Sequence, residues 1–162
     1  MFNFLNGART KIGTPKIAIA LILLLAATSV LITMPTAKAD DIPTFAFIAV
    51  APNPSGVNQP VTVAMWLSMT PITASGLEGD RWTFNVDVTK PDGTTQKLGT
   101  YTSDAVGSAY TTFTPTEIGT YTFQMSFPGQ HITGWDSYRT RQIDNYYQPS
   151  TSKPATLVVQ QE

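Results

Sequence analysis

The chain has 162 residues, of which 42% are hydrophobic and 13% are charged, and it contains one histidine and no cysteine. The lack of cysteine excludes a disulfide framework and a thiolate metal site. Four of the ten basic residues precede residue 40, whereas all eleven acidic residues lie at or after it. Residues 40–162 therefore carry six basic and eleven acidic side chains, a net charge of −5. This acidic balance argues against a nucleic-acid partner, which requires a basic surface.

The N-terminal segment has the three-part pattern of an export signal. Three basic residues precede an uncharged, mainly apolar run at residues 17–34, and the small residues Ala37 and Ala39 follow. We expect residues 1–39 to form a hydrophobic signal helix that is cleaved after Ala39. The alternative is a retained membrane anchor, because the run is at the lower limit of a spanning helix, about 17–25 residues. Both predictions place residues 40–162 outside the cell, since the positive flank stays inside.

Residues 40–162 show period-two alternation of apolar and polar side chains and no sustained helical periodicity. Turn signals such as Pro91-Asp92-Gly93 separate the alternating segments. Strands are expected near residues 44–51, 61–68, 82–89, 96–102, 109–114, 121–127 and 155–160. The first of these is apolar on both faces, which is typical of a buried strand or of an edge strand that pairs. About seven short strands at this spacing predict an all-β domain, an immunoglobulin-like antiparallel sandwich.

The sequence Glu117-Ile118-Gly119-Thr120-Tyr121 resembles the tyrosine corner of immunoglobulin-like domains. In that corner a tyrosine hydroxyl hydrogen-bonds to the chain just before strand F. The resemblance places Phe123 where antibody-type domains have their second cysteine, and Trp82 near the place of their core tryptophan. Because Phe123 replaces the cysteine, we expect apolar packing instead of the disulfide.

Three further segments carry a narrower resemblance: Ala51-Pro52-Asn53-Pro54 with Asn58-Gln59-Pro60-Val61-Thr62-Val63, Lys90-Pro91-Asp92-Gly93-Thr94-Thr95, and Tyr146-Tyr147-Gln148-Pro149-Ser150. They make nearly all of residues 40–162 similar to an immunoglobulin-like domain near the N-terminus of large exported archaeal proteins. That domain often precedes a β-propeller of the PQQ-repeat type. The resemblance implies that the chain is a fragment of a longer protein or a stand-alone copy of a module that is usually embedded in one.

Residues 40–162 offer little chemistry for catalysis. His131 is the only histidine, no G-x-S-x-G sequence surrounds a serine, and the acidic residues are scattered over expected turns and solvent faces. We therefore expect no enzymatic activity and no cofactor. Glu78 and Asp80 flank Gly79 in an expected loop, and such carboxylates with loop carbonyls suit Ca²⁺. This pair is the inorganic site that the sequence leaves open.

The segment 128–154 is far longer than a hairpin loop, which commonly has two to five residues. In a sandwich it joins strands F and G, and it emerges at the same end as the segment 70–81 between strands B and C. Aromatic rings among arginines are typical of recognition surfaces. The candidate binding residues of the longer segment are Trp135, Tyr138, Arg139, Arg141, Tyr146 and Tyr147. The alternatives are an ordered flap packed on the sheet, which would cover Trp66, and an extra hairpin.

Three functions are compatible with these features. The first is an extracellular immunoglobulin-like module for cell-surface adhesion or for assembly within a larger envelope protein, with other surface proteins as partners. The second is a carbohydrate-binding module that stacks sugar rings on Trp135, Tyr138, Tyr146 and Tyr147. The third is an accessory domain of an exported enzyme. In each case only residues 1–39 are expected to contact the membrane.

Overall fold

The computed structural model describes residues 39–136, 139 and 141–161, and every regular element in this part of the chain is a β-strand. The expected signal or anchor helix falls almost entirely outside the described residues. No helix long and apolar enough to cross a membrane occurs among the residues that are described.

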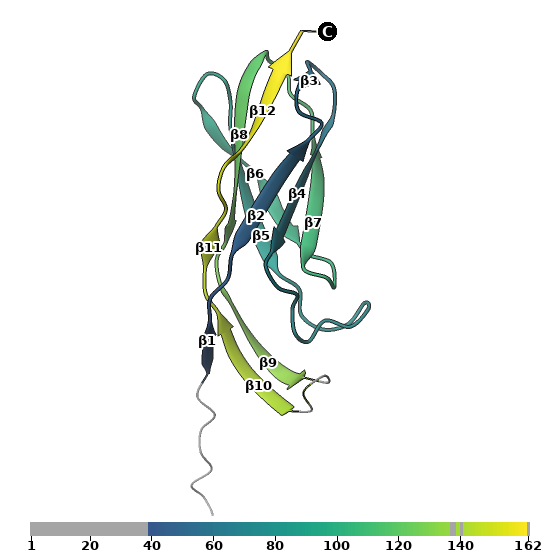
Figure 1. Cartoon of the computed structure of the whole chain (residues 1–162), viewed down its shortest axis with the longest axis vertical. Coiled ribbons are helices and arrows are strands. Elements are labelled where there is room, and N and C mark those ends of the chain that lie inside the picture. The colour runs from purple at the N-terminus through teal and green to yellow at the C-terminus, as the bar shows by residue number, and fades with distance from the viewer. Residues whose placement is uncertain (1–38, 137–138, 140, 162) are drawn as a thin grey trace, which may run out of the picture. The chain divides into compact units, whose positions relative to one another are not determined.

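Two sheets form an immunoglobulin-like sandwich (Figure 1). The first sheet has three strands in the order β2 (Ala46–Ala51), β4 (Val61–Leu67) and β7 (Ser108–Phe113). The second has the order β3 (Ser55–Gly56), β12 (Ala155–Gln160), β8 (Gly119–Phe127), β5 (Thr83–Thr89) and β6 (Thr95–Thr102), and β11 (Ser150–Thr151) also pairs with β8. The seven segments expected as strands form β2, β4, β5, β6, β7, β8 and β12. The all-β sandwich expectation is therefore confirmed.

A third, smaller sheet extends one end of the sandwich (Figure 1). Strands β9 (Gln130–Asp136) and β10 (Arg141–Tyr147) pair as an antiparallel hairpin, and β1 (Asp40–Ile42) adds to β10 in parallel. The segment 128–154 is therefore not one long loop, because most of it forms the extra hairpin that was one of the expected alternatives.

The core lies between the two sheets and follows the period-two pattern of their strands. On β4, Val63 and Met65 are fully buried while Trp66 is partly exposed. On β8, Phe123 is fully buried and meets Phe113 of β7 edge to face, with ring centroids 5.1 Å apart. Aromatic packing thus joins the sheets at the position where antibody-type domains have a disulfide.

Trp82 connects the sandwich core to the hairpin. It lies one residue before β5, is fully buried, and donates a hydrogen bond from Nε1 to the carbonyl of Met69 at 2.9 Å. Its indole packs edge to face against Phe127, with centroids 5.5 Å apart, and against Tyr147 of β10, at 4.8 Å. A core tryptophan with its N–H satisfied in this way holds the hairpin against the end of the sandwich.

The corner before β8 has the geometry of the tyrosine corner that its sequence predicts. The Tyr121 hydroxyl is buried and accepts a hydrogen bond from the backbone N–H of Glu117 at 3.0 Å. Gly119 has φ +132°, and a Cβ on it would lie 2.7 Å from the Cβ of Pro91. Only glycine fits both this backbone conformation and the close approach of the neighbouring turn.

Candidate functional site

A pocket lies between the hairpin and the connection from β4 to β5, and we call it the hairpin pocket. Three elements contribute its walls: Asp40 and Ile42 of β1, Met69, Thr70 and Ile72 of the connection, and Arg139, Arg141, Asn145 and Tyr147 of the hairpin.

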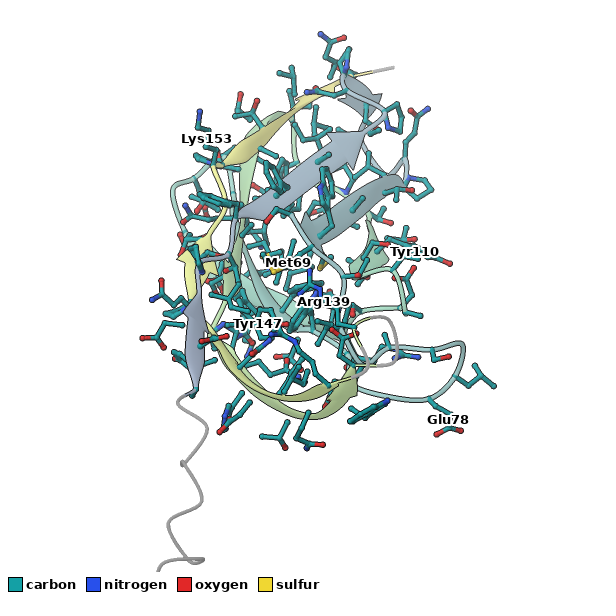
Figure 2. The ribbon with its side chains drawn as sticks, turned by 60° about the horizontal axis from the view of Figure 1, so that its bottom comes forward. Met69, Glu78, Tyr110, Arg139, Tyr147 and Lys153 are labelled. Carbon is teal, nitrogen blue, oxygen red and sulfur yellow. The ribbon has the colours of Figure 1, made fainter. Side chains whose placement is uncertain are left out.

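The hairpin pocket has a volume of ≈ 530 Å³, within the roughly 300–1,000 Å³ of typical ligand sites. Figure 2 shows Met69, Arg139 and Tyr147, which come from the connection and the hairpin, close to one another at this place. The two segments that were expected at the same end of the sandwich therefore form one pocket.

Hydrogen bonds hold the hairpin and the connection together. The Gln130 side-chain amide donates from Nε2 to the carbonyl of Arg81 at 2.9 Å, and the Trp82 indole joins Met69 to Tyr147 as described above. At the far end of the hairpin, the backbone N–H of Arg139 donates to Oδ1 of the buried Asp136 at 3.1 Å. Three lining residues, Met69, Arg139 and Tyr147, are thus held by contacts with neighbouring residues, which favours a preformed site.

The two faces of the hairpin differ because side chains alternate along each strand. On the inner face, Ile132, Ile143 and Tyr147 are buried. On the outer face, Trp135 is 56% exposed and Tyr146 is 37% exposed. The prediction that Tyr147 belongs to the stacking platform is therefore wrong. Tyr147 is 3% exposed and packs on Trp82, so it does not share a surface with Trp135 and Tyr146. Tyr138 lies outside the described residues.

The polar groups of the hairpin pocket suit an acidic ligand. Arg139 and Arg141 are exposed residues that line it, and Asn145 adds a buried amide. A guanidinium presents paired donors that match a carboxylate or phosphate in a bidentate arrangement. Asp40 is the acidic residue among the lining residues, so the wall carries two positive charges against one negative charge.

His131 belongs to the outer face of the hairpin and does not line the pocket. Its Nε2 lies in close contact with Oδ1 of Asp144, and its side chain is 54% exposed. The pair joins β9 to β10 and becomes an ion pair when the histidine is protonated. Exposed pairs of this kind contribute about 0–1 kcal/mol.

The candidate calcium residues lie in the connection between β4 and β5. Oδ2 of Asp80 accepts a hydrogen bond from the Thr73 hydroxyl at 2.6 Å, while Glu78 is exposed at the tip of the loop (Figure 2). The Arg81 guanidinium donates to the carbonyl oxygens of Glu78 and Asp80, each at 2.8 Å. The positive guanidinium of Arg81 therefore lies against the carbonyl oxygens that a cation would need. Among the described residues no three histidine or acidic side chains gather to hold a metal, and calcium binding stays a prediction.

A second surface was not expected from the sequence. A groove of ≈ 390 Å³ runs beside β2 and is lined by residues 44–48 and by Ser150, Thr151, Lys153 and Pro154. Next to it Phe45 is 62% exposed, and Phe47 stacks on Trp66 with ring centroids 5.6 Å apart and planes 13° apart. Trp66 is 36% exposed, so the hairpin does not cover it. The signal in the sequence was the outward position of Phe45 and Phe47 on an otherwise apolar strand.

Comparison with protein-family models finds no match, and comparison with curated proteins finds none either. Among solved structures, the chain is similar to a CARDB domain from Pyrococcus furiosus that was crystallised in complex with di-metal ions. The identity is 16%, the TM-score is 0.36, and the match covers 74% of this chain and 96% of that chain. We base the immunoglobulin-like assignment on the strand order of the two sheets.

Proposed function

We propose that residues 40–162 form a non-catalytic extracellular recognition module that binds another surface protein through the hairpin pocket. The observation that carries this proposal is the pocket of ≈ 530 Å³ that the hairpin, β1 and the β4–β5 connection line together. Its two arginines favour an acidic group of the partner, such as an aspartate, a glutamate or a chain end. The aromatic wall at Tyr147 supplies the apolar contact that recognition sites combine with such charges.

The test measures retention of the fluorescently labelled full chain on cell envelopes from the source organism. We expect the double variant Arg139→Glu, Arg141→Glu to reduce retention at least about tenfold, because like charges would meet in the contact. Lys97→Glu is the matched control, since it makes the same type of charge reversal on β6, outside the pocket. Equal retention of the double variant and of the control would contradict the proposal.

A carbohydrate-binding module is the second candidate, because Trp135 and Tyr146 are exposed on one face of the hairpin. Aromatic rings on a protein surface can stack on the apolar faces of sugar rings. In the same retention experiment, protease treatment of the envelopes should abolish binding to a protein partner, whereas periodate oxidation should abolish binding to a glycan. Loss on periodate together with loss on Trp135→Ala would favour this candidate over the first.

We also propose that the module serves a longer exported protein, as the narrower resemblance to propeller-associated archaeal domains implies. The partner in that case is a neighbouring domain, which could be a β-propeller or the catalytic domain of an exported enzyme. Sequencing the gene beyond the codon of Glu162 tests this proposal. An open reading frame that continues into a further domain supports it, and a stop codon directly after Glu162 contradicts it.

A further inference from the structure

One edge of β2 has no strand partner among the described residues. β2 is the last strand of its sheet, and among the described residues its only strand partner in that sheet is β4. On its other side, residues 44–48 face β11 and the segment 153–154 across the groove of ≈ 390 Å³. The groove leaves space beside this part of the edge, and β12 also approaches β2.

The pairing with β4 shows which backbone groups point to this edge. Ser68 donates its backbone N–H to the carbonyl of Phe45 at 2.9 Å, and the register from Ala46 to Ala51 continues without a shift. Because hydrogen-bonded and non-hydrogen-bonded pairs alternate in an antiparallel ladder, the N–H and C=O groups of Ala46, Ile48 and Val50 point away from β4. These groups form a row of donors and acceptors along the edge, of which Ala46 and Ile48 line the groove and Val50 lies beyond it.

Strand β2 itself lacks the charges and prolines that usually prevent strand addition, and Lys153 is the charged residue that lines the groove beside it. Natural edge strands carry charges, prolines or bulges. β2 has the sequence Ala-Phe-Ile-Ala-Val-Ala, with no charged residue and no proline. By contrast β6, an edge strand of the other sheet, carries Lys97, and its pairing with β5 shifts register between Val86 and Asp87.

We propose that β2 of a second copy of this chain adds antiparallel to this edge, with the two-fold axis at Ile48. Ala46 would then pair with Val50 of the second copy, Ile48 with Ile48, and Val50 with Ala46. About six backbone hydrogen bonds would join these three pairs. On the outer face, Phe47 lies opposite Ala49 and Phe45 opposite Ala51, so a large side chain always meets a small one. No like charges meet, because neither strand carries any. The sequence of the edge is thus complementary to itself in this register.

Sedimentation velocity of the full chain over a concentration series tests the dimer. We expect Ala49→Lys to raise the dissociation constant about tenfold or more, because it places two ammonium groups near the axis on the outer face. Thr112→Lys is the matched control, since it adds the same charge to the same outer face on β7. A wild-type chain that stays monomeric at every concentration, or a dimer that both variants leave unchanged, would overturn the proposal.

Single cysteines test the register, because the chain contains no cysteine of its own. Two copies of Ile48→Cys would meet at the axis with Cα atoms about 5.5 Å apart, which is within the range for a disulfide. Two copies of Ala51→Cys would lie roughly 20 Å apart along the strands. We expect an oxidised dimer for Ile48→Cys and none for Ala51→Cys. Equal cross-linking of the two would refute this register, and this result does not depend on the folding of Ala49→Lys.

Discussion

At the scale of single residues, the corner before β8 depends on one hydroxyl and one glycine. Tyr121 is 1% exposed, and its hydroxyl is the acceptor for the Glu117 N–H. Gly119 lets the chain turn against Pro91. Because a buried donor without an acceptor costs about 1–3 kcal/mol, the Tyr121 hydroxyl should contribute measurably to the stability of the domain.

We predict that Tyr121→Phe lowers the free energy of unfolding by about 1–3 kcal/mol, because Glu117 loses its acceptor inside the protein. Urea denaturation followed by tryptophan fluorescence measures the change. Tyr110→Phe is the control, because Tyr110 is 77% exposed. Loss of its hydroxyl should change the free energy of unfolding by less than about 0.5 kcal/mol. Equal effects of the two substitutions would exclude a role for the corner.

At the scale of elements, the hairpin is part of the core and not an appendage. Ile132, Ile143 and Tyr147 are buried with the sandwich residues in one hydrophobic cluster. Trp82 lies between them and the sheets, since its ring packs on both Phe127 and Tyr147. The hairpin should therefore unfold together with the sandwich.

We predict that Ile143→Ala lowers the global free energy of unfolding by about 2–5 kcal/mol, as large-to-small core substitutions do. Ile143 is 3% exposed, whereas its neighbour Gln142 is exposed, so Gln142→Ala is the matched control. The same urea titration measures both. A hairpin that unfolds on its own would instead give a separate early transition, with no change in the main one.

At the scale of the whole molecule, the sequence before residue 40 carries basic residues and no acidic ones, whereas residues 40–162 are acidic. We predict that protein recovered outside the cell begins at Asp40, because the small residues Ala37 and Ala39 fit the peptidase cleft. N-terminal sequencing measures this directly. Ala39→Leu should block cleavage, while Asp41→Asn, which lies past the site, should leave it unchanged. An exported chain that keeps residues 1–39 would support the membrane anchor.

Prediction from the sequence succeeded where side chains alternate cleanly. In β4 and β8 every second side chain is apolar and buried. The positions of these two strands and of their core residues could therefore be predicted from spacing alone. The hairpin strands were not predicted individually because polar residues occupy their inner face. Asp136 and Asn145 are buried there, and they interrupt the apolar pattern that marks a strand. The sequence left open whether β2 is a buried strand or an edge strand, because spacing does not tell which strand ends a sheet.

The sequence by itself determined the number of main strands, the corner at Tyr121 and the acidic balance of residues 40–162, because each depends on local spacing or composition. Only the tertiary structure decided which aromatic residues are exposed. Tyr146 and Tyr147 are neighbours in the chain, yet one faces solvent and the other packs on Trp82. The reason is that a strand sends successive side chains to opposite faces, and the face that becomes buried depends on what packs against it.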